Sequence, residues 1–149
     1  YCAPDSLLRV FIPRLAKNYE NVVIDSPAGL EHLNRKVISD IDDLFVLSDP
    51  SDKSIKHIER IKKIAKEIGV IYRHFYLVAN HEFDNETERY LQRADGTYLG
   101  RMDYDANVKE YNLKARSLLE LPEDSPACVS IQNILTKAGY KIGGVRIRG

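Results

Sequence analysis

Short apolar runs alternate with amphipathic stretches along the chain, and each pattern predicts a different kind of element. The apolar runs are continuous, which is typical of parallel strands that are covered on both faces of a sheet. We therefore predict buried strands at residues 22–25, 44–47 and 75–79, with a shorter strand at 98–99.

The clearest helix is predicted directly after Ser51. Isoleucine and alanine recur there at spacings of three and four residues, which places them on one helical face, while Lys and Glu occupy the other. Ser51 is suited to cap this helix at its start and Gly69 to end it. Further helices are predicted from Asp5 or Ser6 to Lys17, at 30–39, at 84–94, and at 126–138 with Asp124 or Ser125 as the cap.

This alternation predicts an α/β fold with one open, mostly parallel sheet and helices on both faces. In such folds, ligands bind at the carboxyl ends of the strands. Polar residues follow every predicted strand, namely Asp25, Ser48 with Asp49, Asn80, and the segment from Asp103 to Asp105. We therefore expect a binding site at this edge of the sheet, although Asp and Asn are also common in ordinary turns.

The composition narrows the classes of function. The chain has 149 residues, a formal net charge of zero and 44% hydrophobic residues. These values favour one globular domain and give no electrostatic basis for nucleic-acid binding. No apolar run approaches the roughly 20 residues that cross a membrane. The two cysteines, Cys2 and Cys128, form neither a disulfide framework nor a paired-cysteine zinc site, which predicts a reducing, cytoplasmic location. Cys128 is expected to be a small buried thiol.

The turn after the first predicted strand has a distinctive composition. Asp25 closes the strand, and Ser26, Pro27, Ala28 and Gly29 follow. A carboxylate held at a strand end can orient a metal-bound water, and a segment with little side-chain bulk lets its backbone approach a phosphate. A tight turn capped by Asp25 is the simpler alternative.

Four segments together resemble one family. In chain order they are VVIDSPAGLEHLNRK, LFVLSDPSDKSIKHIERIKKIAKEIG, VANHE and SLLELPEDSPA. They resemble the MinD-type deviant phosphate-loop ATPases, and most of all the CooC-type ATPases that assist nickel insertion into carbon monoxide dehydrogenase. The resemblance covers residues 1–138 and leaves 139–149 as a tail.

The resemblance implies a dimeric, cytoplasmic protein that uses ATP or ADP with magnesium and delivers nickel or zinc to carbon monoxide dehydrogenase or a related metalloenzyme. By position, Asp25 matches the acid that orients a magnesium-bound or attacking water. Gly29 matches the glycine whose amide senses the terminal phosphate. Asn80 matches a strand-end asparagine that contacts adenine, and His81 beside it is a candidate for contact with the base edge.

Two further segments match the family pattern only in part. The segment 102–105 matches a later loop that contacts the base. Asp103 stands where the family has proline, whereas Tyr104 and Asp105 keep the pattern. Cys2 matches the second cysteine of a Cys-x-Cys pair that binds a metal between two subunits, and the first cysteine of that pair is not in this sequence.

The family's phosphate-binding loop has no counterpart in these 149 residues, because no GxxxxGK[ST] sequence or lysine-rich variant occurs. The resemblance therefore implies the C-terminal half of such an ATPase, and this half alone is not expected to bind ATP tightly or hydrolyse it. It also implies unpaired strand edges, which would close together or pair with a second copy.

Two other classes of function remain open. A receiver-type signalling module also has an acid at the end of a central strand, and Ser48 would be its switch hydroxyl. That class requires an acidic pair at its first strand and a lysine where this chain has Asn80. A non-catalytic α/β interaction domain is the second alternative, and nucleotide binding distinguishes it from an ATPase half.

Overall fold

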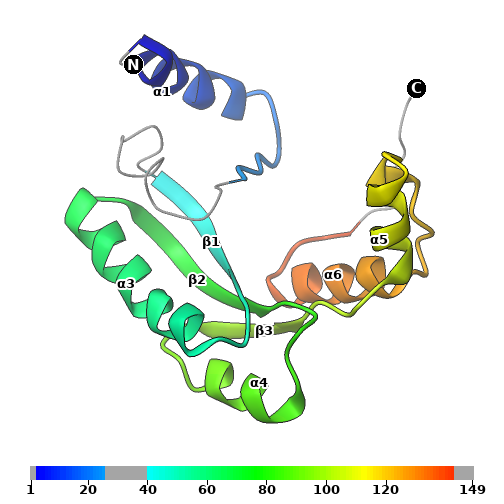
Figure 1. Ribbon diagram of the computed structural model, residues 1–149. Coiled ribbons are helices and arrows are strands. Elements are labelled where there is room, and N and C mark those ends of the chain that lie inside the picture. Colours follow the sequence, from blue (N-terminus) through cyan, green and yellow to red (C-terminus); the bar gives the residue numbers. More distant parts are fainter. Residues whose placement is uncertain (1–2, 26–39, 143–149) are drawn as a thin grey trace. The chain divides into compact units, whose positions relative to one another are not determined.

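The structure is a computed structural model that describes residues 3–25 and 40–142 (Figure 1). The described elements are, in order, α1 (Ala3–Ala16), β1 (Asp40–Ser48), α3 (Asp52–Ile68), β2 (Ile71–Ala79), α4 (Asn85–Gln92), β3 (Thr97–Arg101), α5 (Ala106–Leu113), the short 3-10 helix η1 (Leu118–Glu120) and α6 (Pro126–Lys137). The chain divides into two compact units. One comprises Tyr1–Leu44 with Lys56–His74, and the other Phe45–Ile55 with Phe75–Gly149.

The three strands form one open parallel sheet in the order β1-β2-β3, so the predicted α/β class is confirmed. Between β2 and β3, Tyr76 lies opposite Thr97 and Ala79 opposite Arg101, with a register shift after Leu77. β2 is therefore the central strand of the described sheet, and β1 and β3 are its outer strands.

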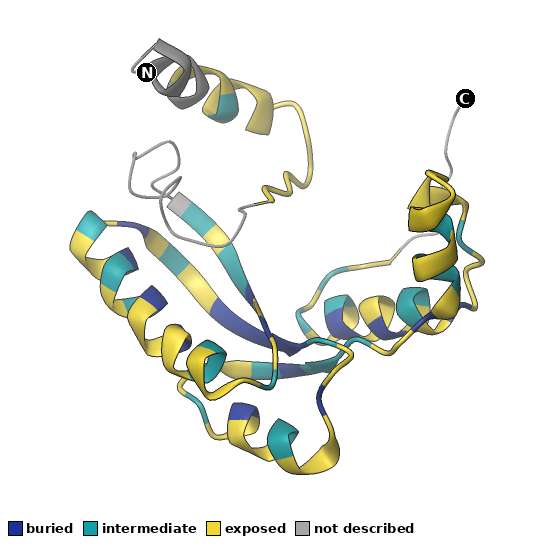
Figure 2. Ribbon diagram, viewed as in Figure 1, coloured by how far each residue is buried: buried dark blue, intermediate teal, exposed yellow. Residues whose placement is uncertain are grey.

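The second unit has its core around the C-terminal half of β2, where residues 75–79 are all buried (Figure 2). Tyr76 and Val78 pack with Leu99 of β3 and Ile134 of α6. Side chains alternate along a strand, so Phe75 and Leu77 point to the opposite face, towards Gly96, which lies between α4 and β3. α4 and α6 both pack against β3.

The first unit contains most of α3, whose predicted apolar face is confirmed. Ile58, Ile61 and Ala65 are buried, as their spacing on one helical face requires. Gly69 has a φ of 73°, a conformation that suits glycine, and the next N–H, of Val70, donates to the carbonyl of Ala65 at 2.9 Å. Gly69 therefore ends the helix as predicted.

The strand predicted at 22–25 is wrong. These residues have no regular secondary structure, and Val23 is 93% exposed. An apolar run becomes a strand only when neighbouring strands satisfy its backbone groups, and the described sheet consists of β1, β2 and β3 alone. Asp25 is consequently exposed and does not end a strand. The helix predicted at 30–39 lies outside the described residues.

Two strands begin earlier in the chain than predicted, because they include polar residues before the apolar run. β1 begins at Asp40 and β2 at Ile71, each before the predicted apolar run. Across the two strands, Asp42 Oδ1 lies 3.4 Å from Arg73 Nε, and Asp43 Oδ1 lies 2.6 Å from His74 Nδ1. An ion pair and a hydrogen bond across neighbouring strands both favour their pairing, and hydrophobic periodicity gives no signal of such polar pairs.

Helix α5 was not predicted, because none of its residues is buried and it therefore lacks an apolar stripe. Ser125 caps α6, as predicted. Asp84, predicted as the first residue of a helix, instead caps α4, where its carboxylate accepts from the N–H of Thr87 at 2.7 Å. At the N-terminus, α1 begins at Ala3 and so before the predicted caps Asp5 and Ser6.

Candidate functional site at the carboxyl ends of the strands

The three strands end side by side in the second unit. The N–H of Asn80, just after β2, donates to the carbonyl of Ser48 at 2.9 Å. The N–H of Met102, just after β3, donates to the carbonyl of Ala79, also at 2.9 Å. These two bonds continue the strand pairing past the strand ends, so Ser48, Asn80 and the segment 102–105 share one edge as predicted. We call this edge, with the loops 80–83 and 102–105, the β2–β3 rim.

The turn from β1 to α3 is held by hydroxyl groups. Ser48 is 2% exposed, and its Oγ lies 3.0 Å from Ser54 Oγ. Ser51 caps α3 as predicted, since its Oγ accepts from the N–H of Ser54 at 3.1 Å. The Ser51 hydroxyl and N–H hold the pKa of the Asp49 carboxyl below its usual value. Each of these polar groups has a structural partner within the turn.

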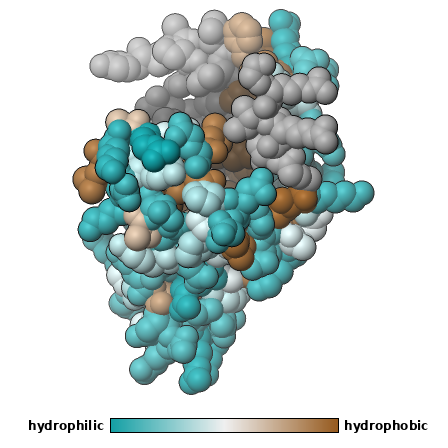
Figure 3. Space-filling view, turned by 90° about the vertical axis from the view of Figure 1, so that its right-hand side faces the viewer, coloured by the Kyte–Doolittle hydropathy of each residue, from teal (hydrophilic) through white to brown (hydrophobic). Residues whose placement is uncertain are grey.

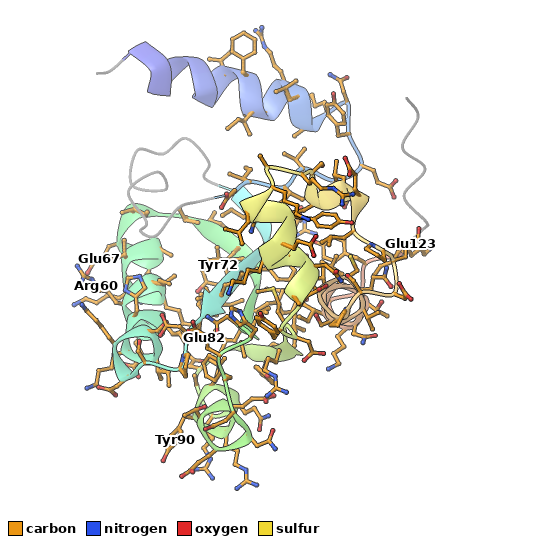
Figure 4. All side chains as sticks on the ribbon, turned by 45° about the vertical axis from the view of Figure 1, so that its right-hand side comes forward. Arg60, Glu67, Tyr72, Glu82, Tyr90 and Glu123 are labelled. Atoms are coloured by element: carbon orange, nitrogen blue, oxygen red, sulfur yellow. The ribbon has the colours of Figure 1, made fainter. Side chains whose placement is uncertain are left out.

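The loop after β2 orients the side-chain amide of Asn80. The N–H of Glu82 donates to Asn80 Oδ1 at 2.9 Å, which assigns the amide oxygen to the loop and leaves Nδ2 as the donor. Nδ2 makes a longer contact, 3.5 Å, with the carboxylate of Glu82, which Figure 4 labels in this loop. Asn80 is therefore set to offer a hydrogen-bond donor at the rim.

Asp105 connects two helices. Its Oδ1 accepts from the N–H of Asn107 at 2.8 Å and so caps α5, and its Oδ2 accepts from the N–H of Ala127 in α6 at 3.2 Å. Burial alone would raise the pKa of Asp105, but the Ser125 hydroxyl and the two N–H donors outweigh it and hold the pKa below its usual value. The carboxylate thus fixes the loop that carries Tyr104.

Two aromatic side chains meet at the rim. The rings of His81 and Tyr104 have centroids 5.7 Å apart and are tilted by 48°. Both residues are exposed, and they come from the loops after β2 and β3 respectively. The two tilted rings form an exposed aromatic surface in the loops that flank the Asn80 donor, and a heterocyclic base can stack on one face of an aromatic ring of this kind.

The second anchor of the 102–105 loop lies in α6 and was missed from the sequence. The N–H of Asp103 donates to Ser130 Oγ at 3.1 Å. Ser130 is buried, and its hydroxyl in turn donates to the carbonyl of Pro126 at 2.8 Å. A serine on the apolar face of a predicted helix was the available signal for this contact.

No protein-family profile matches the chain. It is 36% identical over 140 residues to an uncharacterized ATP-binding protein of Methanocaldococcus jannaschii, MJ0685, covering 92% of this chain and 55% of the relative. A second uncharacterized ATP-binding protein of that organism, MJ0823, is 27% identical over 145 residues, covering 89% and 55%. The carbon monoxide dehydrogenase accessory protein CooC of Rhodospirillum rubrum is 28% identical over 130 residues, covering 85% and 48%.

The resemblance to the MinD-type, CooC-like ATPases is confirmed. The chain spans about half the length of the curated relatives that it matches. Two of these relatives are named as ATP-binding proteins and one as an accessory protein.

Two of the residues that the CooC-like pattern singles out, Cys2 and Gly29, lie outside the described residues. Within residues 3–25 and 40–142, no group of three His, Cys, Asp or Glu side chains is arranged to hold a metal ion. Cys128, expected to be a small buried thiol, is a free thiol that is only partly buried. None of the described helices has the length and apolar character to span a bilayer.

The face of the chain that Figure 3 shows is mainly hydrophilic, with separate apolar groups. Around α5 and η1, Leu113 is 80% exposed and Leu119 is 75% exposed. Arg116 braces this turn, since its guanidinium lies 4.0 Å from the centre of the Tyr111 ring and Nη2 lies 2.9 Å from Glu120.

Proposed function

We propose that this chain forms the base-recognition part of an ATP-binding protein that couples ATP hydrolysis to nickel insertion into carbon monoxide dehydrogenase or a related metalloenzyme. The observation that carries the proposal is the β2–β3 rim, where Asn80, His81 and Tyr104 converge. The similarity to two proteins named as ATP-binding supports the choice of nucleotide, and the similarity to a carbon monoxide dehydrogenase accessory protein supports the choice of client.

The rim residues fit the base end of ATP. Asn80 Nδ2 is a hydrogen-bond donor, because Oδ1 already accepts from the loop, and adenine presents ring nitrogens that accept hydrogen bonds. The rings of His81 and Tyr104 provide stacking surface for the purine. Asp105 would act by holding Tyr104 in place, because its two oxygens already accept backbone N–H groups; a direct contact with the base remains a prediction.

The phosphate end requires residues beyond the rim. Asp25 has an exposed carboxylate, which suits a magnesium ligand or a group that orients water, and Gly29 would contact the terminal phosphate through its amide. The sequence contains no GxxxxGK[ST] loop, so we propose that a segment outside these 149 residues supplies it. Bound ATP would supply the free energy of hydrolysis for metal transfer.

The remaining parts of the proposal follow the family resemblance. We propose a cytoplasmic homodimer in which Cys2 contributes to a nickel or zinc site shared by two subunits. The alternatives are a non-catalytic α/β interaction domain, which predicts no nucleotide binding, and a receiver-type module. A receiver requires a mobile switch hydroxyl, whereas the Ser48 hydroxyl is buried and bonded within its turn.

Calorimetric titration of the 149-residue chain with adenosine, AMP and Mg-ATP tests the proposal. If the chain holds the base and not the phosphates, the three affinities agree within about threefold. Asn80→Ala weakens adenosine binding at least about tenfold, because it removes the oriented donor. Asn112→Ala, at an exposed asparagine of α5, is the matched control and leaves binding unchanged. If none of the three ligands binds, the proposed base site is wrong. If Mg-ATP binds much more tightly than adenosine, the proposal that this chain holds the base but not the phosphates is wrong.

A further inference from the structure

Arg101, the last residue of β3, contacts both loops of the rim. Its Nη1 donates to the carbonyl of Phe83 at 3.1 Å, at the end of the loop that carries Asn80 and His81. Its Nε lies 3.8 Å from Asp103 Oδ1, in the loop that carries Tyr104. The Arg101 side chain is 32% exposed, and its contact with Phe83 is partly buried.

The orientation of Arg101 is itself fixed by α4. Glu88 Oε2 lies 3.3 Å from Arg101 Nη1, and the other oxygen of Glu88 accepts from the hydroxyl of Tyr98. The Glu88 side chain is 19% exposed. Arg101 thus uses the fixed fork of its guanidinium to join three segments, which a flexible lysine ammonium cannot reproduce with the same geometry.

We infer that Arg101 is the positioning residue that holds the two loops of the β2–β3 rim at the separation needed for base binding, with Glu88 as its anchor. The identity of the ligand in this inference rests on the proposed function. The role of Arg101 in holding the two loops does not depend on which ligand binds. In this role Arg101 touches neither His81 nor Tyr104; it fixes the backbone segments from which these rings project.

Asp103 adds a second restraint to its loop. Its carboxylate lies within reach of Arg101, and its N–H donates to Ser130 Oγ in α6. The loop after β3 is therefore held from both β3 and α6.

The test compares Arg101→Gln with Arg89→Gln, a control at an exposed arginine of α4. Two readouts are taken on the full 149-residue chain: the nuclear Overhauser effect between the ring protons of His81 and Tyr104, and the affinity for adenosine. Arg101→Gln is expected to abolish the ring contact and weaken adenosine binding about tenfold, because the fork that joins the loops is lost. Arg89→Gln is expected to change neither.

Two further variants keep the test decisive. Arg101→Lys retains the charge without the fork, so it is expected to preserve the melting temperature and still lose the ring contact. Glu88→Gln leaves the Phe83 contact in place and is expected to weaken adenosine binding about threefold; it replaces Arg101→Gln if that variant fails to fold.

Unchanged adenosine affinity in Arg101→Gln overturns the inference, whether or not the ring contact persists. Full rescue by Arg101→Lys also overturns it, since charge alone would then suffice. If the unaltered chain binds no adenosine, the proposed function fails, and the positioning role is decided by the ring contact: its loss in Arg101→Gln supports the role and its persistence contradicts it.

Discussion

Asp105 accepts a hydrogen bond from the N–H of Ala127, at 3.2 Å, although 22 positions separate the two residues in the chain. The contact joins the loop after β3 to the first turn of α6. A carboxylate near a helix N-terminus satisfies an N–H group that has no partner within the helix and interacts favourably with the helix dipole. Because Asp105 also caps α5, one side chain fixes the direction of two helices.

Replacing Asp105 tests this structural role. Asp105→Ala removes the cap of α5 and the contact with the Ala127 N–H of α6, and we expect the melting temperature to fall by roughly 5 °C or more. Thermal unfolding followed by circular dichroism provides the measurement. Asp124→Ala, at an exposed aspartate of the segment before α6, is the control and is expected to leave the melting temperature nearly unchanged. Equal effects of the two variants would contradict the structural role of the Asp105 carboxylate.

The pH dependence of stability isolates the charge on Asp105. Its pKa is lowered in the folded chain from the reference value of 3.8, so its stabilising effect is complete above that value and is lost as the pH falls through the lower, folded pKa. Asp105→Asn carries no charge at any pH. The difference in unfolding free energy between the two proteins is therefore expected to be constant near neutral pH and to shrink below about pH 4. Urea titrations at a series of pH values measure it, and a difference that grows with acidity would contradict the assignment.

Gly96 packs too closely against the core to carry a side chain. A Cβ built on it would lie 2.8 Å from Leu77 Cγ and 3.0 Å from Phe75 Cδ1. Leu77 is fully buried and cannot move aside freely, so Gly96→Ala is expected to cost about 1–3 kcal/mol in unfolding free energy. A double-mutant cycle with Leu77→Ala provides the control, because the cost at Gly96 should shrink once the leucine side chain is removed. An unchanged cost would mean that the contact with Leu77 is not its cause.

β1 is an outer strand of the described sheet, and unpaired strand edges invite pairing with a second chain. Leu47 on this strand is 60% exposed. We predict concentration-dependent dimers that Leu47→Lys weakens at least about tenfold, because charge on an edge strand opposes pairing. Ile71→Lys, at a residue of β2 that is 65% exposed, is the matched control. Sedimentation velocity distinguishes the outcomes, and dimers that withstand Leu47→Lys would place the interface elsewhere.

The strongly periodic parts of the fold were predictable. Helix α3 and the buried part of β2 follow from the spacing of isoleucines and from a continuous apolar run, since both patterns report burial directly. The error at 22–25 has the opposite cause. An apolar run indicates that a segment can be buried, but the described sheet offers it no partner, and Val23 is 93% exposed. Helix α5 buries nothing, so its only sequence signal was the capping residue Asp105.

The position of the candidate site was predictable from the sequence, whereas the structural roles of individual residues within it were not. Parallel strands bring their carboxyl ends to one edge, which correctly placed Asn80 and Tyr104 together at the rim. The sequence could not show that the Asp105 carboxylate also contacts α6, or that Arg101 reaches the loop after β2. Both facts depend on contacts between residues 18 or more positions apart, which local patterns do not report.

Adenine binding at the β2–β3 rim can be observed residue by residue through amide chemical shifts of the 149-residue chain during titration with AMP. We expect the largest shifts on Asn80, His81 and Glu82 after β2 and on residues 102–105 after β3, with none of comparable size along α3. Shifts confined to α3 or α5, or no shifts at all at saturating AMP, would contradict it.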